Sequence, residues 1–342
     1  MRRWIVIGVV TAQALVLAAM AGEREWIVRT GEGVWLRTAP VDPRDLFRGD
    51  YVALEYEVSH VEADKLRGAL ADPQAMSREL EKTVYAALRR DESGIAEVES
   101  LSDARPAGGL CLRGRLERYP RWMGTSHVVY GIEAMFVEQG KGLEIEQARN
   151  REDVQVPMEV EVAVSSSGVA VLRGWRWSRL GLGLRIEPLP RPPAGTPPPD
   201  PRAPGPPRPY RITLKLANVS DRPLAVVDLP DHASFPLVPI RGTATRWKPT
   251  RRNAPPPPRD EDVKFLEPGQ SIEVRLDLAE PQWIVEDALA MKRNVGQLSW
   301  EDWFRLVYTP PNAEACRNLR NTELIWHGQL PSRAISGARS VD

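Results

Sequence analysis

Residues 40–57 read PVDPRDLFRGDYVALEYE, and this stretch decides how the folded part of the chain begins. Asp42-Pro43 and Gly49-Asp50 are turn dipeptides, and the residues after them alternate between apolar and polar. Successive side chains of a strand point to opposite faces, so one face of this run is buried and the other is half exposed. The stretch therefore predicts a turn and then a strand over 51–58 with four core-facing residues, Val52, Leu54, Tyr56 and Val58.

An uncharged run lies upstream, at residues 4–22. As a helix it is about 28 Å long, close to the roughly 30 Å hydrocarbon core of a bilayer. Two arginines precede the run and the triplet Glu23-Arg24-Glu25 follows it, which predicts a cytoplasmic N-terminus and an extracytoplasmic, periplasmic bulk. A cleaved signal peptide ending at Ala19-Met20-Ala21 is the alternative, although the run exceeds the usual apolar region of about 7–15 residues. We expect a single-pass anchor in the cell membrane.

Net charge and the distribution of proline indicate how the rest of the chain is organised. The 342 residues carry 46 basic and 46 acidic side chains, so no net field attracts nucleic acid. Residues 188–209 are proline-rich, which predicts an extended polyproline II spacer, with a ligand for SH3-like grooves as the alternative. The expected order is an anchor or signal peptide (1–22), an α+β domain (23–187), the Pro-rich linker (188–209), an immunoglobulin-like sandwich (210–335) and a flexible tail (336–342).

The domain before the linker reads as mainly β with short helices. Asp72-Pro73 is a good helix start, with Asp as N-cap and Pro in the first turn. The predicted strands and hairpins cover 26–29, 33–38, 83–90 with 95–101, 110–116, 127–137, and 156–164 with 169–175.

The domain after the linker reads as all-β. Residues 210–219 place Ile212, Leu214 and Leu216 on one face, and 271–278 repeats the pattern. With further strands at 303–308 and 324–330, these segments predict a β-sandwich of immunoglobulin-like architecture. Cys111 and Cys316 fall in different domains, which favours two separate buried thiols over a disulfide.

Two spaced blocks of sequence resemble the GDYxxLxY family of bacterial membrane proteins. The first is Gly49-Asp50-Tyr51-x-x-Leu54-x-Tyr56, preceded by Asp42, and the second runs from Tyr130 to Glu144. The resemblance covers about residues 1–180 and implies a membrane-anchored protein without an assigned activity that acts beside polytopic membrane proteins. The motif residues form the candidate functional surface: Asp42, Gly49, Asp50, Tyr51, Leu54, Tyr56, Tyr130, Glu133, Glu138 and Glu144.

Clustered carboxylates offer two kinds of chemistry. Asp42, Asp45 and Asp50 could supply oxygen ligands to Ca²⁺, but turn capping accounts for them more simply. Glu133 and Glu138 could form a hydrolytic acid–base pair. Their odd spacing places them on opposite faces of one strand unless the chain bends near Val137, and pairing of Glu133 with Arg113 or Arg115, or capping of the 140–142 turn, is the simpler reading.

Other chemistry-bearing residues are scattered. The four histidines, at 60, 127, 232 and 327, show no metal-ligand spacing, so the sequence predicts no zinc site and no cofactor. Tyr51 points away from the core face and either meets a partner or packs under a second layer. Among Trp300, Trp303 and Trp326, we expect Trp303 on the outside and the other two in the core.

These patterns predict a membrane-anchored, non-catalytic binding or scaffold component of a membrane complex, with a polytopic membrane protein as the possible partner. The alternative is a cell-envelope hydrolase that uses carboxylates near Asp50 and Glu133. The sequence identifies no catalytic residue for it.

Overall fold

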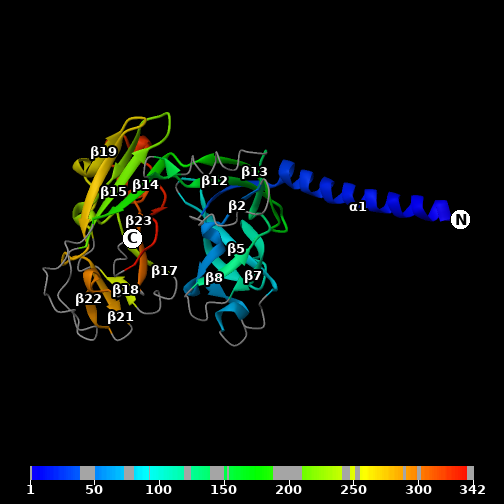
Figure 1. The fold of residues 1–342 in the computed structure, drawn as a ribbon, viewed down its shortest axis with the longest axis horizontal. Coiled ribbons are helices and arrows are strands. Elements are labelled where there is room, and N and C mark those ends of the chain that lie inside the picture. Colours follow the sequence, from blue (N-terminus) through cyan, green and yellow to red (C-terminus); the bar gives the residue numbers. More distant parts are fainter. Residues whose placement is uncertain are drawn as a thin grey trace, which may run out of the picture.

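The computed structural model describes residues 2–38, 51–72, 81–91, 93–118, 125–138, 150–151, 154–187, 210–240, 247–250, 255–287, 290–298 and 302–336. It consists of a long N-terminal helix and two β-rich lobes (Figure 1). The N-terminal lobe is built around a core that runs from Val34 to Ala170, and the C-terminal lobe around a core that runs from Leu180 to Ile335. The mainly β class predicted from the sequence is confirmed.

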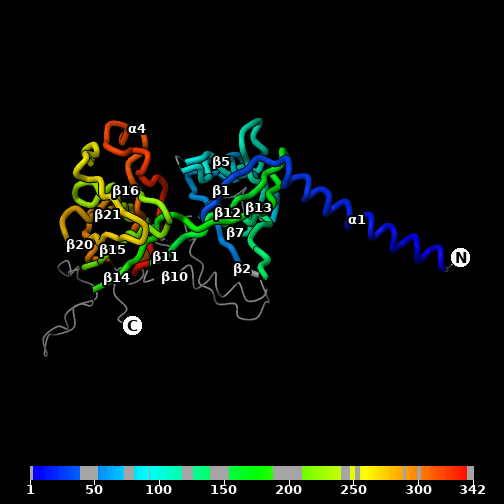
Figure 2. The backbone as a smooth tube through the Cα atoms, turned by 90° about the horizontal axis from the view of Figure 1, so that it is seen from above, coloured from blue at the N-terminus to red at the C-terminus, as the bar shows by residue number. Residues whose placement is uncertain are grey.

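Helix α1 (Arg2–Thr30) is long and apolar enough to cross a membrane. It leaves the N-terminal lobe and points away from both lobes (Figure 2). The strand predicted at 26–29 is wrong, because the helix continues past the apolar run until Gly31. Ile27 is buried against the lobe, and Glu25 and Arg29 form an ion pair of 2.7 Å one helical turn apart.

The larger sheet of the N-terminal lobe, among the described residues, has the order β3-β8-β7-β5-β6-β4. Its strands are β3 (His60–Glu62), β8 (Thr125–Val129), β7 (Cys111–Arg118), β5 (Thr83–Arg90), β6 (Ala96–Ser102) and β4 (Leu66–Arg67). The order β1-β12-β13 joins β1 (Glu32–Arg37), β12 (Met158–Val164) and β13 (Ala170–Trp177), and β2 (Tyr51–Ala53) pairs with β9 (Ala134–Phe136). Short 3-10 turns lie at Glu57–Ser59, Ala63–Lys65 and Gly68–Ala71.

The predicted hairpins at 83–101 and 156–175 are confirmed. The predicted strand at 51–58 is shorter, because it ends at Ala53 and a 3-10 turn begins at Glu57. Its burial alternates as expected, with Leu54, Tyr56 and Val58 all buried. The strand predicted at 127–137 is interrupted after Val129 and resumes at Ala134. Residues 73–80, where we predicted a helix, lie outside the described residues.

The C-terminal lobe contains several smaller sheets. One has the order β10-β11-β14-β15-β20, with β10 (Asn150–Arg151), β11 (Val154–Gln155), β14 (Leu180–Ile186), β15 (Arg211–Asn218) and β20 (Ser271–Asp277). The others pair β16 (Leu224–Val227) with β19 (Val263–Leu266), β18 (Trp247–Thr250) with β21 (Ile284–Asp287) and β22 (Lys292–Asn294), and β23 (Trp303–Tyr308) with β17 (Leu237–Ile240), β24 (Leu330–Pro331) and β25 (Ile335–Ser336). A one-turn helix α4 (Ala313–Cys316) and 3-10 turns at Pro230–His232, Asp260–Asp262, Val295–Gln297 and Thr322–Leu324 connect them.

Strand β14 belongs to the C-terminal lobe, although the sequence placed residues 180–186 in the domain before the Pro-rich linker. It pairs with β15 along its whole length, and Leu180 and Leu182 are part of the C-terminal core. The strand predicted at 324–330 is wrong, because a 3-10 turn ends at Leu324 and β24 begins only at Leu330. Both cysteines are buried and neither forms a disulfide, as predicted. The Pro-rich segment 188–209 and residues 337–342 lie outside the described residues.

Candidate functional site

The two motif blocks lie side by side in the N-terminal lobe. Strand β2, which begins at the motif residue Tyr51, pairs antiparallel with β9, so that Tyr51 is opposite Phe136 and Ala53 is opposite Ala134. Beyond the strand, the Leu54 amide donates to the Glu133 carbonyl at 2.7 Å. Residues about eighty positions apart in the chain are therefore held in one register by backbone hydrogen bonds.

Two motif tyrosines tie the same blocks together from opposite directions. Tyr56 donates its hydroxyl to the Ile132 carbonyl at 2.7 Å, and Tyr130 donates its hydroxyl to the Val58 carbonyl at 2.8 Å. Both rings are buried in the N-terminal core. We call this reciprocal pair of bonds, with Tyr56 and Tyr130 as donors, the tyrosine clasp.

The clasp tyrosines are hydrogen-bond donors rather than nucleophiles. Burial, and to a smaller extent the negative charge of Glu133, raises the pKa of Tyr56 and Tyr130 well above the ordinary value of 10.0. Both hydroxyls therefore keep their protons at any physiological pH. Each proton is directed at the backbone carbonyl of a buried residue, Ile132 or Val58, so these motif residues stabilise the fold.

Glu133 stabilises the same region, where the two motif blocks meet. Its Oε1 accepts the backbone amide of Tyr130 at 2.6 Å, at the break between β8 and β9. Of the two arginines predicted as partners of Glu133, Arg115 instead contacts Glu81 and Glu117, at 3.2 and 3.4 Å. The strand is interrupted at 130–133, and Glu138 is exposed beyond β9.

Asp42, Asp45, Gly49, Asp50 and Glu144 lie outside the described residues, and only the backbone of Tyr51 is described. In the C-terminal lobe, Trp303 is on the outside with 43% of its area exposed, and Trp326 is buried, both as predicted. Trp300 lies outside the described residues.

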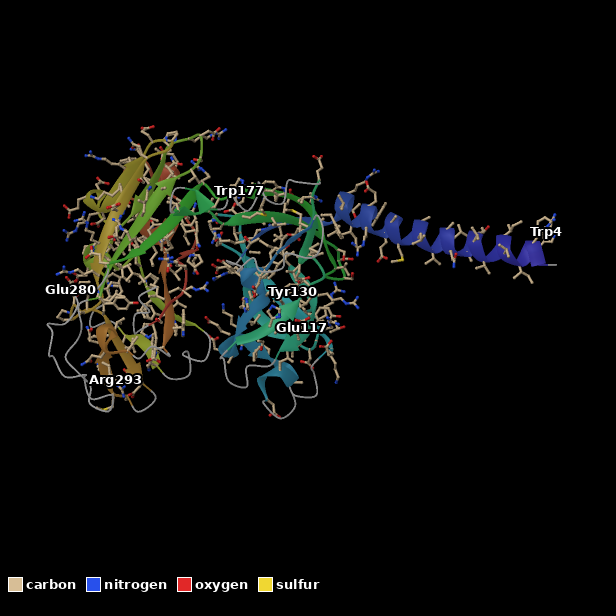
Figure 3. All side chains as sticks on the ribbon, viewed as in Figure 1. Trp4, Glu117, Tyr130, Trp177, Glu280 and Arg293 are labelled. Atoms are coloured by element: carbon tan, nitrogen blue, oxygen red, sulfur yellow. The ribbon has the colours of Figure 1, made fainter. Side chains whose placement is uncertain are left out.

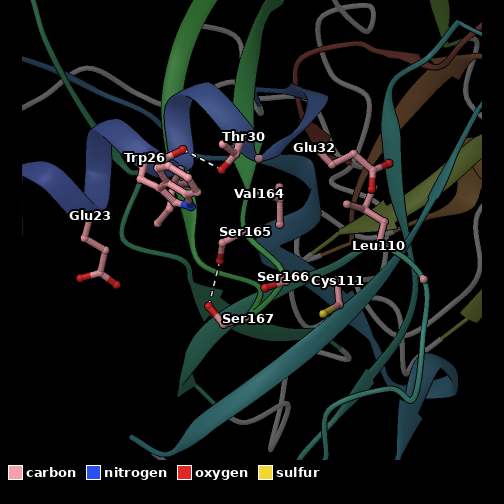
Figure 4. Close-up of a pocket in the computed structure, with 13 residues that line it drawn as sticks. Glu23, Trp26, Thr30, Glu32, Leu110, Cys111, Val164, Ser165, Ser166 and Ser167 are labelled. Carbon is pink, nitrogen blue, oxygen red and sulfur yellow. Dashed lines mark hydrogen bonds between the residues drawn. The ribbon is translucent and has the colours of Figure 1, made fainter.

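A cavity of about 480 Å³ lies where α1 meets the N-terminal lobe (Figure 4). Its walls are the last two turns of α1, residues 109–111, and residues 164–167 at the tip of the β12–β13 hairpin. Trp26 forms part of one wall and is 68% exposed. Ser165 and Ser167 face each other across the hairpin tip, with 2.9 Å between their hydroxyl oxygens. The cavity therefore combines an exposed aromatic ring with a row of hydroxyls.

The walls of this cavity are held rigidly. Arg173 of β13 donates to the Val28 carbonyl at 2.5 Å and so binds the C-terminal end of α1, where a cation also favours the helix dipole. The Gly31 amide donates to the Ile27 carbonyl at 2.7 Å and completes the last turn. On the opposite wall, the Arg113 amide donates to the Gly168 carbonyl at 2.7 Å and fixes the hairpin tip against β7.

One cluster of potential metal ligands is not indicated by the spacing of its residues in the sequence. His60 and His127 are 67 positions apart, yet β3 and β8 place them directly opposite each other, with ring centres 5.3 Å apart. Glu55 lies between them, with its Oε1 at 2.5 Å from His60 Nε2 and 3.9 Å from His127 Nε2. Three potential metal ligands therefore come together. Nothing in the sequence signals the register of β3 against β8, which alone creates the cluster.

Residues 13–174 match the family model described as GDYXXLXY protein. The match spans α1 from its apolar part onward and ends in β13, so it includes both motif blocks, the clasp and the cavity. Comparison with curated proteins and with solved structures found no match.

Proposed function

Because residues 13–174 match the GDYXXLXY family model, we propose that this chain is a membrane-anchored, extracytoplasmic binding component of a membrane complex. Its partner is a polytopic membrane protein, and the contact is made at the cavity beside α1. One observation carries the proposal: the helix that is apolar enough to cross a membrane continues without a break into the wall of that cavity.

The position of the polar end of α1 supports this function. Gly22 ends the uncharged run, and Ile27 is already buried in the lobe. Five residues of helix are about 7.5 Å long, which is close to the depth of one headgroup layer, roughly 5–7.5 Å. The N-terminal lobe is thus tethered against the membrane surface, and Trp26 is at the height where indole rings favour the interface.

Charge supports the orientation. Arg2 and Arg3 precede the apolar run, and positive residues are retained on the cytoplasmic side. The two lobes then lie outside the cytoplasm. The C-terminal lobe, which we propose to be an immunoglobulin-like module joined through the polyproline spacer, adds a second surface away from α1.

The chemistry of the motif favours binding over hydrolysis. Glu133, which the hydrolase alternative needs as an acid or base, is engaged by a backbone amide at 2.6 Å. The tyrosine hydroxyls beside it are directed at carbonyls. These groups are occupied in maintaining the joint between the two blocks.

Site-specific photo-crosslinking in native membranes tests the proposal. A photoreactive residue in place of Ser166, at the cavity mouth, is expected to crosslink to an integral membrane protein upon irradiation. The matched control places the same residue at Glu280, on the C-terminal lobe (Figure 3), and is expected to give no such product. Equal products from both positions, or a Ser166 position that crosslinks only to lipid, would contradict the proposed docking site.

A further inference from the structure

The cluster of Glu55, His60 and His127 carries an inference beyond partner binding. Neutral imidazoles and a carboxylate are the ligands that zinc and related divalent transition metals accept. The side chains remain partly exposed, at 29% for Glu55, 38% for His60 and 28% for His127, so an ion can reach them. The backbone pairing of β3 with β8 fixes the two histidines on one face, so their relative position is set by the sheet.

The distances fit one ion. In a tetrahedral zinc site with bonds of about 2.0–2.1 Å, ligand atoms are about 3.3 Å apart. Here the Oε1 of Glu55 is 2.5 Å from one histidine nitrogen and 3.9 Å from the other, and the three ligand atoms lie within 4.8 Å of one another. Side-chain rotations that move the ligand atoms by about 1 Å would bring all three onto one ion.

A fourth residue orients the cluster. Leu116 is opposite Val128 and Arg118 is opposite His127, so Glu117 is the extra residue of a β-bulge in β7. Bulges redirect side chains, and this one places Glu117 Oε2 at 3.4 Å from the Nδ1 of His127. Histidines that bind metals through one ring nitrogen commonly donate the other N–H to a carboxylate, which fixes the tautomer and raises the basicity of the ligand.

Glu117 is itself positioned. The Arg115 guanidinium lies 3.4 Å from Glu117 Oε1 and leaves Oε2 directed at His127. The resulting chain runs from Arg115 through Glu117 and His127 to Glu55 and His60. A plain surface ion pair between Glu55 and His60 would need neither the bulge nor the second carboxylate.

From this arrangement we propose that Glu55, His60 and His127 form a binding site for a divalent transition-metal ion, with zinc as the reference ion and Glu117 as the residue that orients His127. Both histidines bind through Nε2. Three protein ligands leave a fourth position for water or for a donor atom from another molecule.

The ion would reinforce the motif. Glu55 lies between the motif residues Leu54 and Tyr56, and His127 lies three residues before Tyr130. A metal on these ligands adds a further connection between the two segments that the tyrosine clasp joins. Because an ion that binds only the folded state stabilises it, zinc is expected to raise the melting temperature.

Zinc titration of the full-length protein in detergent micelles, after removal of metals with a chelator, tests the site. We expect saturable binding and a zinc-dependent rise in melting temperature, both lost in H60A and in H127A. Glu117→Gln is expected to keep binding but to weaken it by about 10–100-fold, as for other residues that orient a ligand. The matched control is His232→Ala, which removes a half-exposed histidine that pairs with Asp228 at 2.9 Å in the C-terminal lobe, and it should leave the affinity unchanged.

Two further measurements keep the test decisive. The melting temperature without zinc shows whether each variant folds, and these partly exposed side chains should be replaceable without large loss. Cobalt in place of zinc gives a visible absorption spectrum that reports four-coordinate geometry. Zinc binding that is the same in the double variant H60A/H127A as in the parent protein, or a folded parent protein that binds neither zinc nor cobalt, would overturn the proposal.

Discussion

The guanidinium of Arg37 lies over the indole ring of Trp326, with its central carbon 5.6 Å from the ring centre. Arg37 ends β1 in the N-terminal lobe, whereas Trp326 belongs to the C-terminal core. The same guanidinium donates to the Gln329 carbonyl. A side chain at Gly328, which has a φ of +132°, would approach Arg37 to 2.9 Å, so a glycine is required beside this contact.

Replacing Arg37 by alanine tests how much this contact between the lobes contributes to the free energy of unfolding. Arg37 is 2% exposed and lies 3.9 Å from both Glu57 and Glu159. Removing one member of a buried ion pair costs about 3–5 kcal/mol, and we expect the lower end because Arg176 still binds Glu159 at 2.7 Å. Denaturant unfolding measures the change. Arg176→Ala, whose side chain is 49% exposed, is the control and should cost clearly less; an equal cost would show that the lobe contact adds nothing.

The acidity of Glu57 predicts a pH dependence of stability. Burial raises its pKa from 4.5 to about 7, against the lowering effect of Arg37 and Arg305, while the charges of Glu97 and Asp91 add to the rise. A carboxyl with a raised pKa binds its proton more tightly in the folded state. Its contribution is therefore fully present below pH 4.5 and is lost as the pH rises to about 7.

The melting temperature between about pH 5 and pH 8 measures this effect. We expect it to fall with rising pH in the parent protein and to fall less in Glu57→Gln, which cannot ionise. Parallel curves for the two proteins would rule out a raised pKa for this side chain.

The tyrosine clasp predicts that two substitutions at distant positions lower the free energy of unfolding by similar amounts. Tyr56→Phe and Tyr130→Phe each remove one hydroxyl and leave a buried carbonyl without its donor. Each is expected to lower the free energy of unfolding by about 1–3 kcal/mol. Tyr85→Phe, at a half-buried position of β5, is the control and should stay within about 0.5 kcal/mol. No loss at either clasp position would show that the motif tyrosines serve another purpose.

The junction of α1 with the lobe is expected to be sensitive to one methyl group. A Cβ at Gly31 would lie 2.6 Å from the Ile27 carbonyl and 3.0 Å from the Val164 carbonyl, whereas a Cβ at Gly22 meets nothing within 4 Å. Gly31→Ala should therefore cost about 1–3 kcal/mol of overpacking. Amide hydrogen exchange at 24–30 should accelerate in Gly31→Ala and remain unchanged in Gly22→Ala.

Local patterns predicted most of the strands, because alternation specifies which face is buried. Leu54, Tyr56 and Val58 are buried as their spacing indicates, even though the strand itself ends at Ala53. The segment 26–29 is helical although its local pattern fits a strand equally well. Its helical structure is set by its continuity with the apolar helix and by the burial of Ile27. The sequence of these four residues alone indicates neither.

The candidate sites could be predicted only in part. The motif blocks were recognisable, but the direction of the clasp bonds depends on where the chain breaks between Val129 and Ala134. The pairing of His60 with His127 depends on a register between distant strands, and the role of Glu117 on a one-residue bulge. Long-range pairing of this kind leaves no periodic signal in the sequence.

Labelling with a membrane-impermeant maleimide in intact cells tests the tethered, extracytoplasmic arrangement most directly. Cys111 and Cys316 are buried, at 5% and 1% exposed, so an introduced thiol can be read against low background. Lys292→Cys, at an exposed position of the C-terminal lobe, is expected to react without permeabilisation, whereas Arg2→Cys should react only after it. Reaction of Lys292→Cys only after permeabilisation would contradict the arrangement.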